Sequence, residues 1–368
     1  MRSIISTSAL AALLASGAIQ AGGLDRSGQD TSIILKEGGL FEVTSVSVKP
    51  TVSGTYNALL GGEDTGDVAP DYDMTTVAMR ADINDTMAVA FIKDNPYGAD
   101  VDWTSGPLTG TKGQVKSDAT TALVSYGLGD AVSLYGGIKS QSLEVSAAIP
   151  SKSYTLTSSP SSATGYVMGA AFEKPEIALR VALTYHTKIK HSMAIQETAN
   201  EVGSTMNFYT PSAYNLDFQT GIAANTLLFG SIRRANWTET SIEPNLFMAG
   251  QLLAGAPQAE PLLSYDNNST AYSIGLGRKL NDQWSIAATY GWEKASGEDG
   301  SPFAPSDGNS AYGLGVTYTA DQLSVTVGAR QVDIGDTNVP ITPAGTTYDN
   351  AMADNSGLIT AVKVAYSF

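Results

Sequence analysis

The connections between extended segments alternate in length along this chain, and this alternation restricts the fold more than any other feature. The segments themselves have a period of two. In WSIAATYGW, residues 284–292, the even-numbered residues are apolar with Trp at each end, and the odd-numbered residues are small or polar. Side chains point alternately to the two faces of a β-strand, so this pattern predicts strands with one apolar face. Fourteen such segments can be drawn, at 41–56, 72–83, 86–94, 117–127, 131–146, 162–173, 176–194, 212–222, 226–240, 269–280, 283–295, 309–319, 322–334 and 356–368.

Six of the connections have two or three residues and are rich in the Asn, Asp, Gly and Pro that favour tight hairpins. They lie at 84–85, 128–130, 174–175, 223–225, 281–282 and 320–321, and long connections lie at 57–71, 95–116, 147–161, 195–211, 241–268, 296–308 and 335–355. A soluble sandwich has no reason to gather its short turns at one end. Bacterial outer-membrane barrels have an even number of strands, short periplasmic turns and long outer loops. We therefore predict an all-β fold, a 14-stranded antiparallel transmembrane β-barrel with both termini on the short-turn side.

The length of the apolar strand face agrees with this prediction. The step from Trp284 to Trp292 covers about 26 Å at roughly 3.3 Å per residue. After strand tilt, that length approaches the roughly 25 Å apolar band between the aromatic girdles of a membrane barrel. The mean hydropathy of −0.04 is compatible with a membrane protein, because the lipid face and the lumen face of a barrel cancel in the average.

The N-terminus predicts export. Arg2 precedes a mostly apolar stretch at 4–19, and Ala21 offers a cleavage position, so 1–21 is interpreted as a secretory signal peptide. Ile19 is larger than the small residue usually found two positions before the last residue of a signal peptide, here Ala21. A short hydrophobic anchor is the alternative. No other stretch approaches 18 consecutive apolar residues, which predicts no transmembrane helix in the mature chain. The absence of Cys excludes a disulfide scaffold, and the net charge of −15 argues against a nucleic-acid partner.

Residues 22–40, GGLDRSGQDTSIILKEGGL, precede the first strand and alternate poorly. We predict that this stretch folds into the barrel mouth as a short N-terminal hatch inside the lumen. A disordered periplasmic tail is the alternative. The predicted organisation is therefore signal peptide at 1–21, hatch at 22–40 and transmembrane barrel at 41–368.

Cations recur on the less apolar side of the predicted strands, which we assign to the lumen. The functional interpretation is an electropositive interior that binds a carboxylate or phosphate. The alternative is ordinary lumen packing, with the cations paired to acids such as Asp217 and Glu293. The candidate ligand-binding residues are Arg80, Lys139, Arg180, Arg234, Arg330 and Lys363.

Catalysis and metal binding find little support. His186 and His191 are the two histidines; His186 is predicted on the lumen face beside Thr184, and neither a nucleophile elbow nor an HExxH motif accompanies it. The acidic loop residues lack calcium-loop spacing, so a solvated rim is the preferred interpretation. Those residues are Glu63, Asp64, Asp67, Asp71, Glu298 and Asp299. We predict that the protein is not an enzyme and uses no metal or cofactor.

Several stretches resemble the FadL/TodX family of outer-membrane transporters for long-chain fatty acids and other hydrophobic compounds. They are AGGLDRSGQ at 21–29, VKPTVSGTY at 48–56, INDTMAVAFIKDNPYGADVDW at 83–103, PSAYNLDFQTGIAANTLLFGSIRRANW at 211–237 and the closing AVKVAYSF. The resemblance implies a fourteen-stranded barrel with an N-terminal hatch. It also implies capture of an amphipathic ligand at the outer surface, passage to a lumen pocket and sideways release into the membrane through a strand kink.

The resemblance makes the segment Asn95, Pro96, Tyr97 and Gly98 the candidate strand interruption and lateral gate, because Pro cannot donate a ladder hydrogen bond. One departure concerns the hatch. Many family members carry an Asn-Pro-Ala motif there, whereas 36–41 reads KEGGLF in this chain, which puts gating by the hatch in question.

These observations predict a transporter in the outer membrane of a Gram-negative bacterium that carries long-chain fatty acids or related hydrophobic molecules. A general porin and a structural or adhesive barrel with its function in loops 241–268 and 335–355 are the rivals. The expected partners are the hydrophobic ligand, outer-membrane lipid and lipopolysaccharide, and the barrel-assembly machinery, which would recognise the final strand ending in Phe368. We expect a monomer.

Overall fold

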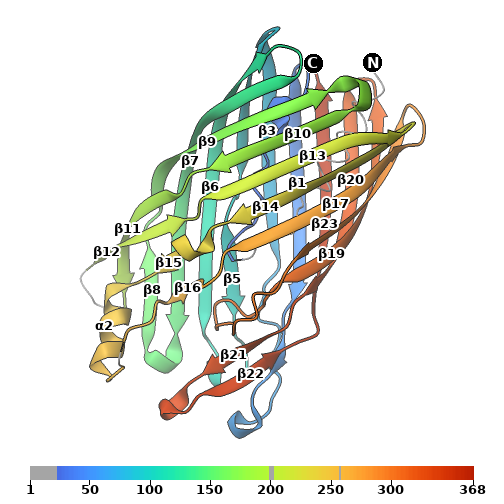
Figure 1. The fold of residues 1–368 in the computed structure, drawn as a ribbon. Coiled ribbons are helices and arrows are strands. Elements are labelled where there is room, and N and C mark those ends of the chain that lie inside the picture. The colour runs from blue at the N-terminus through green and yellow to red at the C-terminus, as the bar shows by residue number, and fades with distance from the viewer. Residues whose placement is uncertain (1–22, 199–202, 257) are drawn as a thin grey trace.

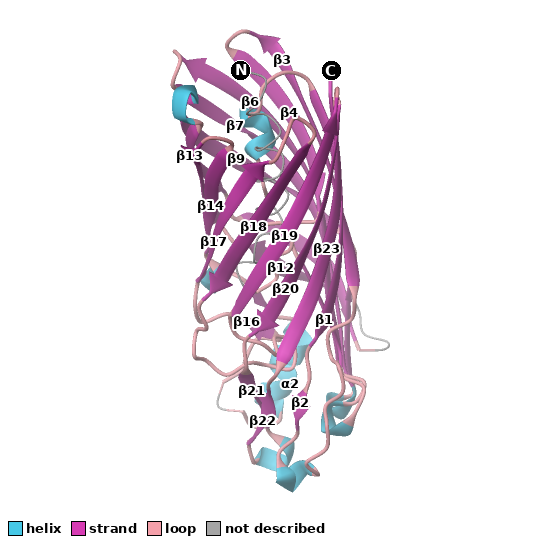
Figure 2. Ribbon diagram, turned by 90° about the vertical axis from the view of Figure 1, so that its right-hand side faces the viewer, coloured by secondary structure: helices cyan, strands magenta, loops and turns pink. Residues whose placement is uncertain are grey.

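The computed structural model describes residues 23–198, 203–256 and 258–368, and the predicted signal peptide at 1–21 lies outside them. These residues form a closed antiparallel barrel, drawn in Figures 1 and 2. Strand β1 (Leu40–Thr51) pairs with the last strand, β23 (Asn355–Ser367), over its whole length and also pairs with β3 (Tyr72–Asn84). The ladder between first and last strand closes the wall, so no strand edge is left open at that seam.

The described part of the chain builds the wall from fourteen strands, as predicted, and four of them are broken into two pieces. In order around the wall they are β1, β3, β4 (Met87–Asp94) with β5 (Gly98–Asp102), β6 (Lys112–Leu128), β7 (Val132–Ile149), β8 (Tyr154–Ser158) with β9 (Ser161–Lys174), β10 (Leu179–His186) with β11 (Ile189–Glu197), β12 (Ser204–Thr210) with β13 (Ala213–Ala223), β14 (Thr226–Ala235), β17 (Ser269–Lys279), β18 (Trp284–Glu293), β19 (Asn309–Ala320), β20 (Leu323–Ile334) and β23.

The tight turns lie at the end of the barrel where β1 begins and β23 ends, and the long loops lie at the other end (Figure 2). Local hydrogen bonds explain two of the turns. The side chain of Asn84 accepts from the backbone N–H groups of Thr86 and Met87, and that of Asn281 accepts in the same way from Gln283 and Trp284. An Asn side chain can bond the backbone two or three residues further on, which stabilises a turn over so few residues.

The long loops contain more regular structure than the sequence predicted. Strands β2 (Gly54–Thr55), β22 (Tyr348–Met352) and β21 (Thr337–Ile341) form a separate small sheet beyond the barrel (Figure 1). The other loop elements at that end are η2 (Ala58–Leu60), η3 (Gly106–Leu108), η4 (Pro150–Lys152), η6 (Trp237–Glu239), β15 (Ser241–Ile242), α2 (Asn245–Leu253), β16 (Leu263–Ser264) and η7 (Pro343–Gly345), while η5 (Pro175–Ile177) forms one of the tight turns. Among the described residues, no helix has the length and apolar character needed to cross a membrane.

The outer face of the barrel is apolar, as β18 illustrates. Trp284 and Trp292 are 44% and 38% exposed, while Ser285 is 2% exposed and points inward. The outward aromatic side chains pack on neighbours across the ladder, with ring centroids 4.9 Å apart for Trp284 and Tyr318. The predicted division of this strand into an apolar outer face and a small polar inner face is therefore confirmed.

The N-terminal segment, residues 23–38, contacts side chains on the inner face of the wall. It contains η1 (Ser32–Leu35), whose residues Ile33, Ile34 and Leu35 are buried in a cluster with inward-facing wall residues such as Ala90 and Leu123. This stretch alternates poorly because it is not part of a strand, and its apolar residues are covered by the barrel.

Candidate functional site

The lumen near the loop end is filled by apolar side chains. We call this group the apolar lumen cluster, and its described members come from the wall, from the N-terminal segment and from loop residues 236–268. They are Leu24, Tyr97, Val115, Leu143, Val145, Ala147, Ile149, Tyr154, Leu156, Met193, Ile195, Met206, Phe208, Ala213, Ala235, Trp237, Ile242, Phe247, Leu262, Leu263, Ala271 and Ala311. Apolar side chains therefore predominate in this part of the lumen, and the same inner faces also carry buried polar side chains, among them Gln141, His191 and Glu197.

Trp237 joins this cluster to the N-terminal segment. Its ring packs edge-on against Tyr97, with centroids 5.8 Å apart, and against Tyr265 at 5.3 Å. Gly23 lies so close to it that a Cβ there would come within 2.7 Å of the indole. Gly23 also has a φ of +57°, a conformation that glycine adopts without strain. The start of the N-terminal segment can thus pack under Trp237 because it has no side chain at this position.

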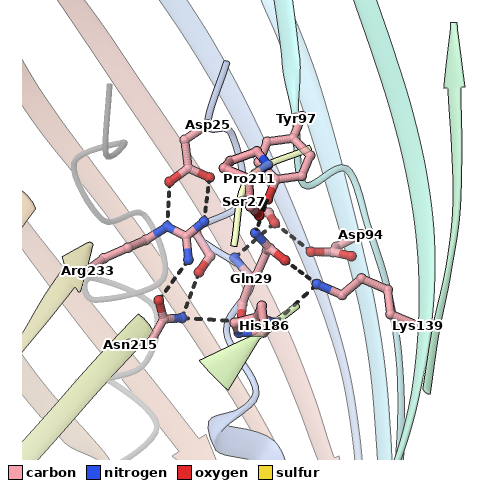
Figure 3. Close-up of polar contacts among 11 residues, drawn as sticks. Asp25, Ser27, Gln29, Asp94, Tyr97, Lys139, His186, Pro211, Asn215 and Arg233 are labelled. Carbon is pink, nitrogen blue, oxygen red and sulfur yellow. Dashed lines mark hydrogen bonds and ion pairs between the residues drawn. The ribbon is translucent and has the colours of Figure 1, made fainter. Parts of the chain in front are cut away.

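A buried ion pair joins the N-terminal segment to the far wall. The guanidinium of Arg233 on β14 donates from Nε and Nη2 to the two carboxylate oxygens of Asp25, at 2.5 and 3.1 Å. Its Nη1 donates to Asn215 Oδ1 at 2.7 Å, and Asn215 in turn donates to the backbone carbonyl of Gly28 at 3.0 Å. Figure 3 shows this arrangement. The side chains of Asp25 and Arg233 are 0% and 4% exposed, so each charge depends on the other.

A second group of buried contacts lies beside this ion pair (Figure 3). Lys139 on β7 donates to Gln29 Oε1 and lies 3.2 Å from His186 Nδ1, and Gln29 Nε2 donates to the Tyr97 hydroxyl at 2.7 Å. Ser27 Oγ donates to Asp94 at 2.5 Å. Polar side chains from three parts of the wall thus bind one turn of the N-terminal segment.

The third wall strand is interrupted at the predicted residues, since β4 ends at Asp94 and β5 begins at Gly98. The ladder between β3 and β4 runs only to the pair Val77 and Lys93. In the described ladders, β3 residues 72–76 pair with β1 alone, and β5 pairs with β6 alone. We call the place where β3 residues 72–76 and β5 have no ladder between them the wall gap.

The N-terminal segment pairs with the strand beside the wall gap. Asp25 and Tyr97 form an isolated antiparallel bridge, the N–H of Arg26 donates to the Pro96 carbonyl at 2.9 Å, and the N–H of Gly98 donates to the Leu24 carbonyl at 2.8 Å. These bonds take up backbone groups that the interruption of the ladder would otherwise leave free.

The side chain of Arg26 reaches from this pairing to the other border of the wall gap. Its guanidinium carbon lies 3.3 Å from the ring centroid of Tyr72, the first residue of β3. A Cβ at Gly98 would come within 2.9 Å of Arg26 Nε, so glycine at 98 gives the guanidinium its space. Burial lowers the pKa of Arg26, while the nearby Tyr72 and Asp100 act to raise it.

Two hollows flank the N-terminal segment in the described structure. The larger lies toward β10, β13 and β14, with Arg180, Asp217 and Phe229 among its lining residues, and has an empty volume of about 920 Å³ including solvent at its mouth. The smaller lies toward β1, β3 and β4, with Met74 and Ile92 in its lining, and has about 730 Å³ on the same measure. Because Met74 belongs to β3 residues 72–76, the smaller hollow borders the wall gap.

Five of the six predicted lumen cations face inward, and four of them already have partners. Arg80 donates to the Gly38 carbonyl and pairs with Asp82 at 2.6 Å, and Lys139 donates to Gln29. Arg180 pairs with Glu173 at 2.5 Å, and Lys363 pairs with Glu42 at 2.8 Å. Among the described residues, the acids that pair with these inward cations and with Arg233 are thus Asp82, Glu173, Glu42 and Asp25. Arg80, Lys139 and Arg180 thus join the wall to the N-terminal segment, since Arg180 also donates to the Leu35 carbonyl. Lys363 joins β23 to β1 within the wall.

Arg330 on β20 differs from the other four. It is 3% exposed, and none of its three guanidinium nitrogens has a hydrogen-bond partner among the described residues. Arg330 and Val332 are consecutive inward-facing residues of β20. Val332 lies nearer the loop end and packs against the apolar lumen cluster. Its side chain passes over Gly313 of the neighbouring strand, where a Cβ would come within 2.7 Å of Arg330 Cγ. A buried cation without a partner therefore lies directly beside the apolar part of the lumen.

The predicted lumen position of Arg234 is wrong. Arg234 is exposed on the outer face beside Tyr214, and its neighbour Arg233 takes the inward position. The assignment failed because it gave the less apolar side of each strand to the lumen, whereas the inner face of β14 carries Leu227 and Phe229. Where the lumen itself is apolar, polarity no longer distinguishes the two faces.

Asp25, Arg26 and Arg233 were missed as site residues. All three lie in stretches that carry the family resemblance, 21–29 and 211–237, and that signal could have drawn attention to them. His186 faces the lumen beside Thr184, as predicted, and contacts Lys139. Within residues 23–198, 203–256 and 258–368, no group of three or more His, Cys, Asp or Glu side chains is arranged to hold a metal ion.

Solved structures with the same fold include a FadL homologue from Pseudomonas aeruginosa, with a TM-score of 0.75, 13% identity and coverage of 96% of this chain and 98% of that one. The toluene transporter TodX from P. putida matches with a TM-score of 0.63 and 12% identity over 90% and 91% of the two chains. The Ralstonia pickettii toluene transporter TbuX gives 0.61 and 10% over 98% of each chain. No protein-family model and no curated protein matches the sequence. The chain therefore has the FadL/TodX fold, and the resemblance seen in the sequence is confirmed at that level.

Proposed function

We propose that this protein is an outer-membrane channel for hydrophobic small molecules. The ligand enters from the loop end, passes the apolar lumen cluster and leaves sideways into the membrane through the wall gap. In this proposal residues 1–21 are a signal peptide, 22–40 act as the hatch and 41–368 form the transmembrane barrel. The known functions of the proteins that share the fold, a FadL homologue and toluene transporters, support the same class of cargo.

The observation that carries the proposal is the apolar lumen cluster and its position. A porin has a polar, water-filled interior, whereas here aromatic and aliphatic side chains fill the loop end of the lumen and continue to Tyr97 at the strand interruption. An apolar molecule gains free energy from leaving water at roughly 25 cal/mol per Å² of buried surface. A lumen of this composition therefore favours hydrophobic cargo over ions.

The contacts of the N-terminal segment support a sideways exit. That segment binds several wall strands through Asp25, Gln29 and its buried isoleucines, so it stands in the way of axial passage. The backbone of the barrel lacks a ladder at the wall gap, and a hollow with both polar and apolar lining residues, among them Met74 and Ile92, lies next to it. In the described structure the wall gap is bordered by Leu24 and Arg26 of the same segment. Movement of these residues would join the lumen to the membrane.

Arg330 supports a cargo that carries a carboxylate. Burying a charge without a partner is costly, and a carboxylate would supply a charge-assisted hydrogen bond to the free guanidinium. The cargo's apolar tail would then lie in the apolar lumen cluster, which begins at the level of Val332. Long-chain fatty acids combine these two features, so we propose them as the preferred cargo and hydrocarbons as weaker ligands.

A reversible crosslink tests the exit route. The chain has no Cys, so Arg26→Cys with Pro96→Cys introduces a single pair. Residues in hydrogen-bonded positions of an antiparallel pair have Cα atoms about 5.5 Å apart, which lies within the range of disulfides. In proteoliposomes, the oxidised variant should bind a fluorescent fatty acid and release it into the bilayer at least tenfold more slowly than the reduced form.

Two controls make the outcome specific. Arg26→Cys alone should be insensitive to oxidant, and both variants should keep the heat-resistant electrophoretic mobility of a folded barrel. Equal release from the oxidised and reduced double variant would show that cargo does not pass between 26 and 96. Ion conductance of the native protein at the level of a porin would refute the hydrophobic channel itself.

A further inference from the structure

The outer face of the barrel carries a group of exposed cations where its apolar band ends. We call Lys188, Lys190 and Arg234 the outer basic patch. Lys188 lies at the β10–β11 break and Lys190 on β11, while Arg234 lies on β14, with β12 and β13 between them in the wall. Lys188 Nζ and Lys190 Nζ lie 4.5 and 5.9 Å from the ring centroid of Tyr209 on β12. Arg234 is paired in register with Tyr214 of β13.

The patch marks a sharp change in the polarity of the outer surface. On the side of the tight turns, β10 presents Val181 and Leu183, which are 37% and 50% exposed. On the side of the loops, β11 presents Ser192, Ala194 and Gln196, and all three are exposed. Tyr185 and Tyr214 pack against each other at this border, with ring centroids 4.8 Å apart and the ring planes tilted by 37°. Aromatic belts of this kind lie at the boundary between the acyl chains and the headgroups.

The cations of the patch lack acidic partners within ion-pair distance among the described residues. Some other cations of the chain do have such partners, as Lys112 with Asp102 at 2.8 Å and Lys279 with Asp282 at 2.9 Å. The nearby carboxylate of Glu239 is engaged by the backbone N–H and hydroxyl of Ser212, both at 3.0 Å. Arg234 makes one hydrogen bond, to the hydroxyl of Thr270 at 3.3 Å. In a chain with 36 acids and 21 basic residues, the cations of the patch are thus still open to an anion from outside the protein.

We propose that the outer basic patch binds the phosphate groups of a phosphorylated glycolipid in the outer leaflet. This inference rests on the proposed membrane location but is independent of the cargo and of the exit route. Phosphates of such lipids lie between the acyl chains and the sugars, which is the level at which the patch lies. Lys and Arg side chains can extend toward that layer while their stems cover apolar surface. The ring of Tyr209 holds both ammonium groups in place through cation–π contacts.

The chemistry of the patch explains why phosphate is the favoured ligand. The two lysines lie beside the same tyrosine ring and repel one another in the absence of an anion, and the phosphates of one lipid offer several strong acceptor oxygens to cations on this surface. Each basic residue near an anionic membrane surface contributes about 1 kcal/mol to attraction, which is about fivefold in affinity. The three together provide about a hundredfold preference for a phosphorylated over an unphosphorylated glycolipid.

The test uses the purified full-length barrel in detergent, titrated with a bis-phosphorylated lipid A and with the same glycolipid after removal of its phosphates. The variants are Lys188→Gln/Lys190→Gln and the same pair combined with Arg234→Gln. The matched control is Lys174→Gln/Arg278→Gln, which removes two outward cations near the tight turns. We expect the Kd for the phosphorylated lipid to rise about 25-fold in the pair and about a hundredfold in the triple variant.

The control variant and the binding of a fluorescent fatty acid should stay at the native level, and all variants should keep the mobility of a folded barrel. The proposal is overturned if the triple variant binds the phosphorylated lipid as tightly as the native protein. It is also overturned if the control loses as much affinity, or if the unphosphorylated lipid binds equally well. If the native protein does not bind the fatty acid at all, the proposed cargo is wrong, but the comparison of lipid binding between the variants still holds.

Discussion

Replacing Asp25 by Asn should release the N-terminal segment from the lumen and leave the barrel wall intact. Asp25 neutralises Arg233 at a place where the two side chains are 0% and 4% exposed, through two hydrogen bonds of 2.5 and 3.1 Å. Asn has the same shape but no charge, so Arg233 would keep its bond to Asn215 and lose its counter-charge. The wall does not depend on this pair, because its strands are joined by backbone ladders.

The size of the effect follows from the burial of the pair. Breaking a buried ion pair by removing one partner costs about 3–5 kcal/mol. An Asn at 25 can still accept a hydrogen bond, so we take the lower end of that range. At 1.4 kcal/mol per factor of ten, the fraction of time that the segment spends undocked should rise about a hundredfold.

Two measurements on the purified protein follow the undocking. Current through single molecules in planar bilayers should change from nearly silent to frequent openings. A Cys introduced at Ser32, in a chain without other Cys, should react with a maleimide much faster in the Asp25→Asn background. The matched control is Asp30→Asn, because Asp30 is an acid of the same segment whose carboxylate accepts hydrogen bonds from its neighbour Ser32.

A double variant separates the charge from the shape of the pair. Asp25→Asn combined with Arg233→Gln removes both charges and keeps hydrogen-bonding side chains, so most of the docking should return. The reasoning is refuted if Asp25→Asn is as silent and as slowly labelled as the native protein. It also fails if the Asp30→Asn control opens to the same degree, or if the double variant stays as open as Asp25→Asn.

Three further predictions concern the hatch, the cargo and the assembly of the barrel. Deleting 24–38 behind an intact N-terminus should convert a nearly silent protein into an ion-conducting pore in planar bilayers, and a silent deletion variant would contradict the hatch. Arg330→Gln should weaken binding of a fluorescent fatty acid about tenfold or more, since hydrogen bonds to charged groups contribute about 1.5–3 kcal/mol. An uncharged hydrocarbon should bind as before, and an equal loss of affinity for both ligands would mean that Arg330 is a purely structural cation. The N–H of Phe368 donates to the Gly39 carbonyl at 3.0 Å, and its ring packs where a Cβ of Gly39 would lie. Removing Phe368 should lower the yield of folded barrel in the membrane far more than it changes ligand binding by the fraction that assembles. An unchanged yield would speak against a role of the last residue in assembly.

The strand pattern could be predicted because it depends on local rules. The period of two in 284–292 marks a strand with two unlike faces, and the turn residues Asn84 and Asn281 mark where such strands reverse. The interruption at 95–98 was predicted from the family resemblance, which implies a strand kink, and Pro96 marked the place because it has no N–H to donate. Elements inside the long loops, such as β21 and α2, were not predicted, because they are short and are stabilised by contacts with one another and with the barrel rim.

The candidate site could be predicted only in part. The inward cations were identified where the opposite face is clearly apolar, as for Arg330 and Lys363. The assignment failed at Arg234, because the lumen at β14 is itself apolar and the two faces of the strand look alike. The partners of the inward cations could not be predicted either, because many acids lie on the inner face and the sequence does not state which of them meet.

The sequence by itself determined the number of strands, their antiparallel order, the end at which the turns gather and the outward face of strands such as β18. Each of these follows from side-chain alternation and turn chemistry within a few residues. Only the tertiary structure decided that Asp25 meets Arg233, 208 positions away, that Arg26 reaches Tyr72 across the wall gap, and that the loop end of the lumen is apolar. These features depend on how the barrel closes around the N-terminal segment. A pair of residues so far apart can meet in many ways that are equally compatible with the local pattern, and closure of the wall selects one of them.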